Sequence, residues 1–241
     1  MPTVPSFDPY AVLQVVPTCE QEVVHAAFKA LALKYHPDRD ATRRAADKMA
    51  EMIGDSGEVA LVVHDQTSRT GIDRRDGFVN RMKEKHPNIN IVDIQYGGGD
   101  PLKSTDLTKA IIQGHPDLKG IFGANEGSII GVLNGVKELG KEGKIVVIGY
   151  DSGQQQIDAI KSGVEAGAIT QDPIGIGYKC VEAAVKALKG ESLPKTIDTG
   201  FHWYDKTNIN DAKIAAGAEL SFDIVAAYSV PLTIATGEDY V

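Results

Sequence analysis

The sequence predicts an α/β protein: a parallel, doubly wound sheet flanked by helices, with a small all-α head at the N-terminus. Two observations predict this architecture. Between residues 54 and 211, short runs rich in β-branched residues alternate with stretches of helical periodicity, which is typical of parallel strands joined by crossover helices. Before residue 54, apolar residues recur only at helical spacing. We therefore expect a helical head over 1–53, an α/β lobe over 54–211 and a tail over 212–241 without an assigned role.

Two helices are expected in the head. The first begins after Thr18 and ends before Pro37, because proline cannot continue a helix. Its apolar residues recur at helical spacing: Val24, Ala27, Phe28, Leu31 and Tyr35. The second helix covers about 41–53 and stops at Gly54.

The lobe is expected to contain five strands and five helices in alternation. Strands are predicted at 59–64, 89–95, 120–124, 144–149 and 166–171. Helices are predicted at 74–86, 103–113, 128–139, 154–162 and 174–189. Right-handed crossovers place the carboxyl ends of parallel strands at one edge of the sheet, where such folds bind ligands.

Four polar residues are predicted to meet at this edge. Asn125, Asp151 and Gln171 each follow or end a strand, and Arg74 opens the first helix of the lobe. Carboxylates and amides can each form paired hydrogen bonds with adjacent hydroxyl groups, and arginine donates a planar fork. The set therefore favours a polyol ligand. The alternatives are that Asn125 and Asp151 only cap helices, and that Arg74, beside Arg75, lies on a solvated face.

Composition and motifs exclude several classes of function. The net charge of −8 argues against a nucleic-acid binder and against a repressor-like regulator, whose head would need a basic recognition helix. We find no nucleophile elbow, metal-ligand spacing or phosphate loop, so we expect no enzyme, no cofactor and no metal. Cys19 and Cys180 match no metal pattern, and we expect no disulfide between them.

Residues 6–50 resemble the J-domain family, through Asp8-Pro9-Tyr10 and the run from Ala27 to Arg39. The resemblance implies docking on a heat-shock ATPase chaperone through six residues: Lys29, Lys34, His36, Pro37, Asp38 and Arg39. Ala30 departs from the family, which usually has a basic residue there. The tripeptide His-Pro-Asp also recurs at 115–117, where it is expected only to end a helix. The alternative is that the head is a short helical cap.

Residues 45–211 resemble the type I periplasmic sugar-binding family, in its ribose-binding-like branch. The resemblance rests on five phrases of this sequence: 59–63 (VALVV), 74–78 (RRDGF), 115–126 (HPDLKGIFGANE), 147–151 (VIGYD) and 168–175 (AITQDPIG). It covers the second lobe of that family and the segment that returns to the first lobe. It implies that a monosaccharide, a pentose or a hexose, binds to the four residues named above.

This chain departs from the family in ways that lower the expected affinity. The first lobe is expected to be missing, and half of a two-lobe clamp predicts millimolar or weaker sugar binding. The return segment, 173–209, is expected to lack its sheet partners, which leaves the apolar residues Ile176, Val181, Val185 and Leu188 to pack elsewhere. Tyr96 is the candidate for an aromatic residue that stacks on the sugar.

The combination of a J-like head with such a lobe looks chimeric. A seam near 41–53, the missing lobe and the unassigned tail favour the hypothesis of an artificial or shuffled fusion without a native function. Residues 1–8 lack the pattern of a signal peptide, and no apolar run reaches the roughly 20 residues of a spanning helix. As written, the sequence predicts a cytoplasmic protein without membrane insertion, whereas the family that the lobe resembles is periplasmic or extracellular.

Overall fold

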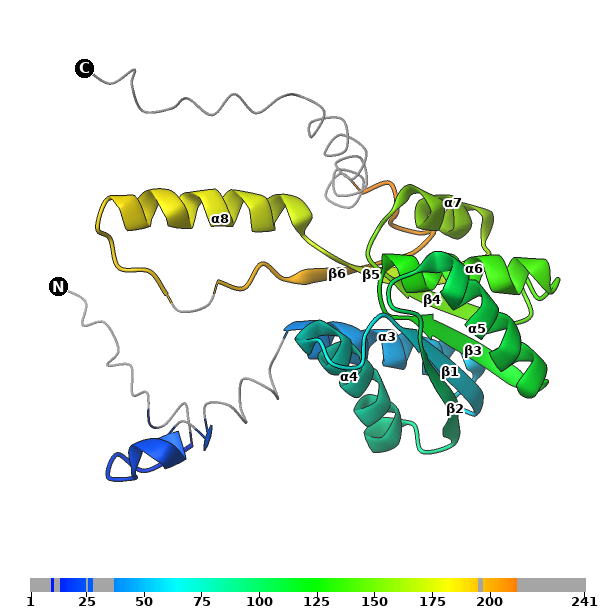
Figure 1. Cartoon of the computed structure of the whole chain (residues 1–241), viewed down its shortest axis with the longest axis horizontal. Helices are drawn as coiled ribbons and strands as arrows, with labels where there is room; N and C mark the ends of the chain where they lie inside the picture. The colour runs from blue at the N-terminus through cyan, green and yellow to red at the C-terminus, as the bar shows by residue number, and fades with distance from the viewer. Residues whose placement is uncertain (1–9, 11–13, 25, 28–36, 195–196, 212–241) are drawn as a thin grey trace, which may run out of the picture.

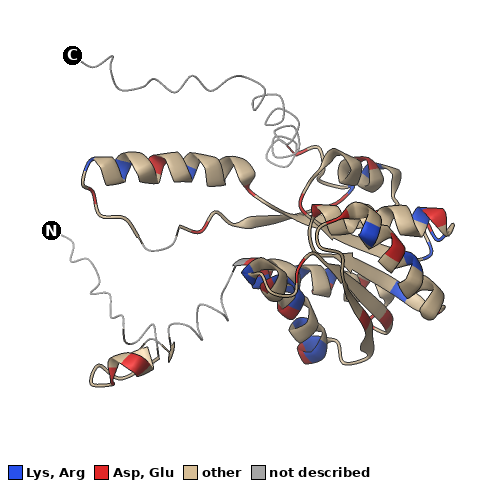
Figure 2. Cartoon of the chain, viewed as in Figure 1, with Lys and Arg blue, Asp and Glu red and all other residues tan. Residues whose placement is uncertain are grey.

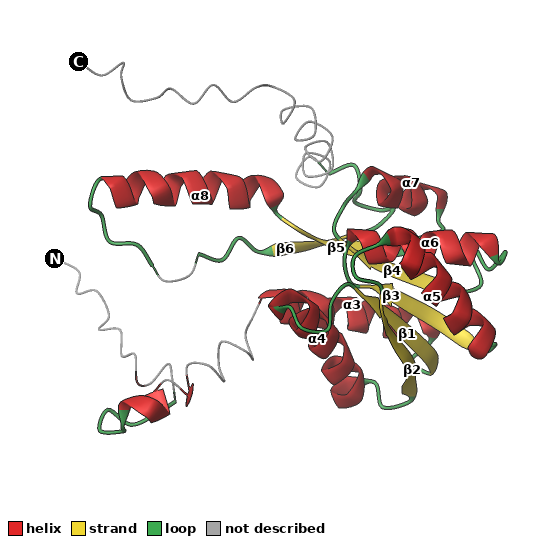
Figure 3. Ribbon diagram, in the orientation of Figure 1, coloured by secondary structure: helices red, strands yellow, loops and turns green. Residues whose placement is uncertain are grey.

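The computed structural model describes residues 10, 14–24, 26–27, 37–194 and 197–211. In this part of the chain six strands form one sheet, with helices packed on both of its faces (Figures 1 and 3). The strands are β1 (Gly57–Val63), β2 (Ile89–Tyr96), β3 (Leu118–Gly123), β4 (Val146–Tyr150), β5 (Gly167–Gln171) and β6 (Phe201–Tyr204). The helices are α3 (Pro37–Ile53), α4 (Arg69–Lys85), α5 (Pro101–Gly114), α6 (Glu126–Glu138), α7 (Gln154–Ser162) and α8 (Pro173–Leu188).

The strand order is β2-β1-β3-β4-β5-β6, and the first five strands are parallel. The predicted α/β class is therefore confirmed, and β1 to β5 correspond to the five predicted strands. β6 is added at the edge, antiparallel to β5, so the sheet is mixed. The sequence predicted that the return segment would lack sheet partners, but β6 obtains them from β5 of the same lobe.

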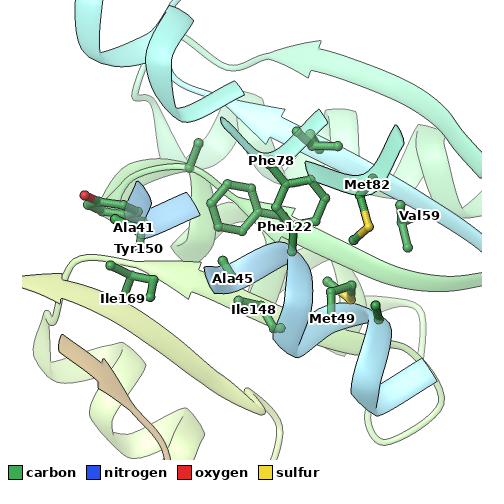
Figure 4. Close-up of a cluster of buried hydrophobic side chains, with 14 of the residues drawn as sticks. Ala41, Ala45, Met49, Val59, Phe78, Met82, Phe122, Ile148, Tyr150 and Ile169 are labelled. Atoms are coloured by element: carbon green, nitrogen blue, oxygen red, sulfur yellow. The ribbon is translucent and has the colours of Figure 1, made fainter. Parts of the chain in front are cut away.

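One face of the sheet is covered by α3 and α4. Alternate residues of β1 point to this face, among them Val59 and Leu61, because side chains alternate along a strand. The rings of Phe78 on α4 and Phe122 on β3 are stacked, with centroids 4.8 Å apart, and Figure 4 shows them at the centre of the cluster. The opposite face packs against α5, α6 and α7, through a second apolar cluster and a smaller third one.

Helix α3 belongs to this core. Ala41, Ala45 and Met49 are fully buried and lie against Ile148 and neighbouring sheet residues (Figure 4). The helix is continuous from Pro37 to Ile53, so the seam expected near 41–53 runs through a single packed element. The expected division after residue 53 separates α3 from β1, although both contribute to one apolar cluster.

Helix α8 differs from the other helices of the lobe, because none of its residues is buried. Figure 1 shows it projecting away from the sheet between β5 and β6. The expectation that its apolar residues would find other packing is not met among the described residues: Val181 is 65% exposed and Leu188 is 89% exposed.

Several smaller expectations concern the rest of the chain. His115 is the C-cap of α5, so the second His-Pro-Asp tripeptide does end a helix, as predicted. Both cysteines are free thiols.

Among the described helices, none combines the length and the apolar character required to cross a bilayer. Acidic and basic residues are interleaved along α3 to α6 (Figure 2). The tail, 212–241, lies outside the described residues.

Candidate functional site

The candidate site lies at the edge of the sheet where the parallel strands end. Asn125 follows β3 after one residue, Asp151 follows β4 directly, and Gln171 is the last residue of β5. Arg74 was predicted to open its helix, but α4 begins one turn earlier, at Arg69, so Arg74 lies in its second turn. Helix α4 covers the neighbouring face of the sheet.

The Arg74 side chain is the centre of the site. It is only 7% exposed, and its Nη1 donates a hydrogen bond of 2.8 Å to the carbonyl of Ala124. The guanidinium lies over the ring of Tyr150, 3.6 Å from the centroid, and its Nη1 is 3.9 Å from a carboxylate oxygen of Asp151. The buried Nε has no hydrogen-bond partner among the described residues. Arg74 is therefore fixed from several sides and retains a donor.

Asp38 is a site residue that the sequence assigned to another role. Its Oδ1 accepts hydrogen bonds of 2.9 Å from the Tyr150 hydroxyl and from the Gln171 amide. Its Oδ2 lies 3.5 Å from Nε of Arg74. Asp38 thus joins three elements of the edge: α4, β4 and β5.

The J-domain resemblance had placed Asp38 on an exposed docking turn. It is instead 2% exposed, because α3 begins at Pro37 and presents one side to the sheet. The signal was available in the sequence, since residue 38 shares a helical face with Ala41 and Ala45. Arg39 is also engaged within the lobe, 2.7 Å from a carboxylate oxygen of Asp73. Of the other proposed docking residues, Pro37 is the first residue of α3, whereas Lys29, Lys34 and His36 lie outside the described residues.

Asp151 has an unusual backbone conformation. Its φ of 77° falls in the left-handed region, which residues other than glycine adopt rarely. The carboxylate Oδ2 accepts a hydrogen bond of 2.8 Å from the backbone N–H of Glu126, at the start of α6. Burial raises the pKa of Asp151, and the carboxylate of Asp38 adds to the shift; Arg74 acts in the opposite direction.

Asn125 caps α6, as the alternative interpretation allowed. Its side-chain oxygen accepts a hydrogen bond of 3.0 Å from the N–H of Ser128. The neighbouring loop is close to it, because Gly127 approaches the carbonyl of Gly99 so tightly that a Cβ would lie 2.0 Å from that oxygen. Capping uses the oxygen of Asn125 and leaves the amide group with no hydrogen bond recorded among the described residues.

Two further side chains at this edge were not predicted. The ring of Tyr150 supports Arg74, and burial raises the pKa of its hydroxyl, which therefore stays a donor. His64 follows β1, and its Nε2 is 3.2 Å from the Thr70 hydroxyl. Burial and the nearby Arg74 lower the pKa of His64, which favours the neutral imidazole. Tyr96, the candidate stacking residue, instead accepts a hydrogen bond of 3.0 Å from Nη1 of Arg75.

This arrangement can bind a ligand that both donates and accepts hydrogen bonds. One cation lies between two carboxylates, with two amide side chains at the rim, and these groups match adjacent hydroxyls. Within the described part of the chain, no group of His, Cys, Asp and Glu side chains has metal-binding geometry. An open α/β sheet with such an edge defines a ligand-binding lobe.

The comparisons identify the family. The periplasmic binding protein domain matches residues 38–192, so the chain belongs to this family. The match begins at Asp38, at the start of α3. The chain is 29% identical over 153 residues to the ribose import binding protein of Bacillus subtilis, and the alignment covers 64% of this chain and 48% of that protein. It is 30% identical over 141 residues to the D-allose-binding periplasmic protein of Escherichia coli, covering 58% and 45%.

Solved structures agree. An ABC transporter solute-binding protein from Agrobacterium vitis, bound to α-D-tagatopyranose, is 36% identical with a TM-score of 0.71, over 75% of this chain and 60% of that one. A second protein from that organism, with bound D-fucose, is 31% identical with a TM-score of 0.72, over 74% and 61%. The chain thus spans about half the length of the curated relatives it matches. All are binding proteins by name, which agrees with the expectation that the chain is not an enzyme.

Proposed function

We propose that this chain is the sugar-contacting lobe of a solute-binding protein of an ABC transporter. It binds a monosaccharide, a pentose or a hexose, at the carboxyl edge of the sheet through Arg74, Asn125, Asp151 and Gln171. Asp38 and Tyr150 hold two of these side chains, those of Arg74 and Gln171, in place. On this proposal the lobe begins at Pro37, where α3 starts.

One observation carries the proposal. Arg74, Tyr150 and Gln171 come from three separate elements, and all three contact the carboxylate of Asp38. Burying so many polar groups in one place costs free energy unless they satisfy each other or a ligand. The names of the relatives supply the ligand class: ribose, allose, tagatose and fucose are all neutral monosaccharides.

The expected affinity is low. The candidate residues all come from one sheet edge, and a sugar bound by this edge alone is not enclosed and stays in contact with water. We therefore expect a millimolar or weaker dissociation constant, which corresponds to a binding free energy of only about 4 kcal/mol.

NMR titration of the chain with ribose, allose, arabinose and galactose tests the proposal. Shifts should concentrate on amides near residues 74, 125, 151 and 171. Arg74→Lys should weaken binding, because an ammonium cannot reproduce the planar fork. Arg75→Lys is the matched control and should bind as the original does, because Arg75 contacts Asp76 and Tyr96 instead. Shifts spread evenly over the surface, or equal loss in both variants, would contradict the proposal.

The second candidate is a J-type co-chaperone, which rests on the resemblance of residues 6–50. The buried carboxylate of Asp38 weighs against it, since the expected docking turn needs that residue at the surface. Stimulation of a heat-shock ATPase by the full chain, abolished by His36→Gln, would support it. ATPase rates unchanged by the chain would remove it.

A further inference from the structure

The left-handed backbone of Asp151 is held by a residue from a distant part of the chain. The hydroxyl of Tyr204, on β6, donates a hydrogen bond of 2.6 Å to the carbonyl of Asp151. On the other side of the same residue, the N–H of Asp151 donates a hydrogen bond of 2.8 Å to the carbonyl of Ile169. A residue other than glycine stays at φ 77° only when its surroundings impose that conformation.

Tyr204 is well placed to impose it. Its side chain is fully buried, in a cluster with Ile157, Ile160 and Ala168. Burial raises the pKa of its hydroxyl, so the group remains protonated and can donate. The register of β6 against β5 pairs Tyr204 with Ala168, which fixes the height of the ring along the sheet.

The strand that carries Tyr204 is anchored independently of Asp151. The indole Nε1 of Trp203 donates to a carboxylate oxygen of Asp205 at 2.8 Å, and the amide of Asn208 donates to the carbonyl of Trp203 at 3.1 Å. These contacts join β6 to the turn that follows it, and pairing with β5 holds β6 in the sheet. None of them uses the Tyr204 hydroxyl, so the hydroxyl contributes something separate from strand anchoring.

We propose that Tyr204 is a positioning residue, which locks the backbone of Asp151 so that its carboxylate faces Arg74 and the N–H of Glu126. Without the hydroxyl, the Asp151 carbonyl loses its donor, and the residue can relax toward an ordinary backbone conformation. The carboxylate then leaves the N–H of Glu126. The consequence for sugar affinity rests on the proposed function, whereas the consequence for the backbone does not.

Amide hydrogen exchange of the full chain, without sugar, tests the backbone claim. In Tyr204→Phe the amides of Asp151 and Glu126 should exchange about tenfold faster, the scale expected for one hydrogen bond. Asp205→Ala is the matched control: it removes the anchoring contact of Trp203 but not the hydroxyl, and should leave both amides within about twofold. Equal acceleration in both variants, unchanged exchange in Tyr204→Phe, or acceleration spread over the whole sheet would each overturn the proposal.

Titration with the sugars named above separates this inference from the proposed function. If the unmodified chain binds a sugar, Tyr204→Phe should raise the dissociation constant about three- to tenfold, and Asp205→Ala should not. Unchanged affinity in Tyr204→Phe would then overturn the positioning role. If no variant binds any sugar, the proposed function fails, and the exchange rates of Asp151 and Glu126 alone decide whether Tyr204 fixes this loop.

Discussion

The sheet core and helix α8 are both rich in apolar residues, but only the core buries them. In the core, Phe122 and Ile148 are fully buried between α3, α4 and the sheet. On α8, Tyr178 is 69% exposed and Leu188 is 89% exposed. An apolar face on a helix predicts that this face packs against another surface. Which surface covers it, or whether any does, depends on the arrangement of the whole fold.

The exposed face of α8 has a regular pattern. Its large apolar residues alternate in steps of four and three along the helix: Ile174, Tyr178, Val181, Val185 and Leu188. Such spacing is typical of an apolar seam, the stripe along which two helices pack against each other. Along α8 the structure also has shallow hollows of about 190 to 450 Å³, lined partly by Leu193, Pro194 and Ile197. The apolar face of α8 is therefore uncovered among the described residues.

The largest expected effect comes from removing a large side chain from the apolar core. Phe122→Ala removes a fully buried ring stacked on Phe78, and should lower the free energy of unfolding by about 3–5 kcal/mol. Leu188→Ala on α8 is the control and should change it by less than about 0.5 kcal/mol. Urea denaturation followed by circular dichroism measures both. A comparable loss in Leu188→Ala would mean that α8 is buried in solution.

The next effect concerns the start of α3. Asp38→Ala removes the nearer of the two carboxylates beside the buried Arg74 guanidinium and should destabilise the chain by about 3 kcal/mol. Asp38→Asn keeps an acceptor for Tyr150 and should cost less. Asp40→Ala, on the same helix but 47% exposed at its side chain, is the control and should be nearly neutral. If Asp40→Ala were as harmful as Asp38→Ala, the loss would reflect the helix and not the site.

A smaller effect depends on pH. Glu165 is buried, with one oxygen 3.3 Å from the Gln156 amide and the other unpaired among the described residues. Burial raises the pKa of Glu165 well above its ordinary value, so the folded chain holds a proton that the unfolded chain releases. The stability of the folded state therefore falls as the pH rises above about 4.3. Glu165→Gln, which cannot ionise, should gain stability over the original chain between pH 5 and pH 8.

The control for this prediction lies on α8. Lys179 and Lys186 lower the pKa of Glu182 to about 2, so Glu182 stays ionised in both states over the same pH range. Glu182→Gln should therefore show no pH-dependent difference between pH 5 and pH 8. Denaturation midpoints at both pH values decide the matter, and a pH-independent gain in Glu165→Gln would refute a buried, protonated carboxyl.

The smallest expected effect is that of a substitution on the exposed face of α8. Val181→Asp places a charge in the middle of the apolar seam, at a residue that is 65% exposed. It should change the free energy of unfolding by less than about 0.5 kcal/mol. Chain association, followed by analytical ultracentrifugation, should also be unchanged if α8 is uncovered in solution. A clear drop in stability or in molar mass would show that the seam has a partner.

Much of the lobe could be predicted from the sequence, because its elements are defined by local patterns. The helix at 154–162 was predicted with the bounds that the structure has, and the strands differ by one or two residues at their ends. The placement of Asn125, Asp151 and Gln171 at one edge also followed, since parallel strands end on the same side, and Arg74 reaches this edge from α4. Their role as sugar ligands stays a prediction.

Other parts of the site could not be predicted, because they depend on contacts between distant segments. Asp38 and Gln171 are 133 residues apart, and nothing local indicates that they meet. The assignment of Asp38 to a docking turn was favoured by the His-Pro-Asp motif that Asp38 completes. The helical face that it shares with Ala41 and Ala45 indicated burial, but the groups that it contacts there depend on α3 packing against the sheet. Tyr204 is a similar case, since the sequence assigned its strand to a missing lobe.

The sequence by itself determined the alternation of strands and helices, the parallel sheet and the polar residues that follow its strands. These features depend on side-chain periodicity and on the handedness of the chain, which act over short distances. Only the tertiary structure decided that α3 closes the site, that β6 pairs with β5 and that α8 is exposed. Each of these depends on which surfaces are available to bury apolar area and to satisfy polar groups, and that is a property of the folded chain as a whole.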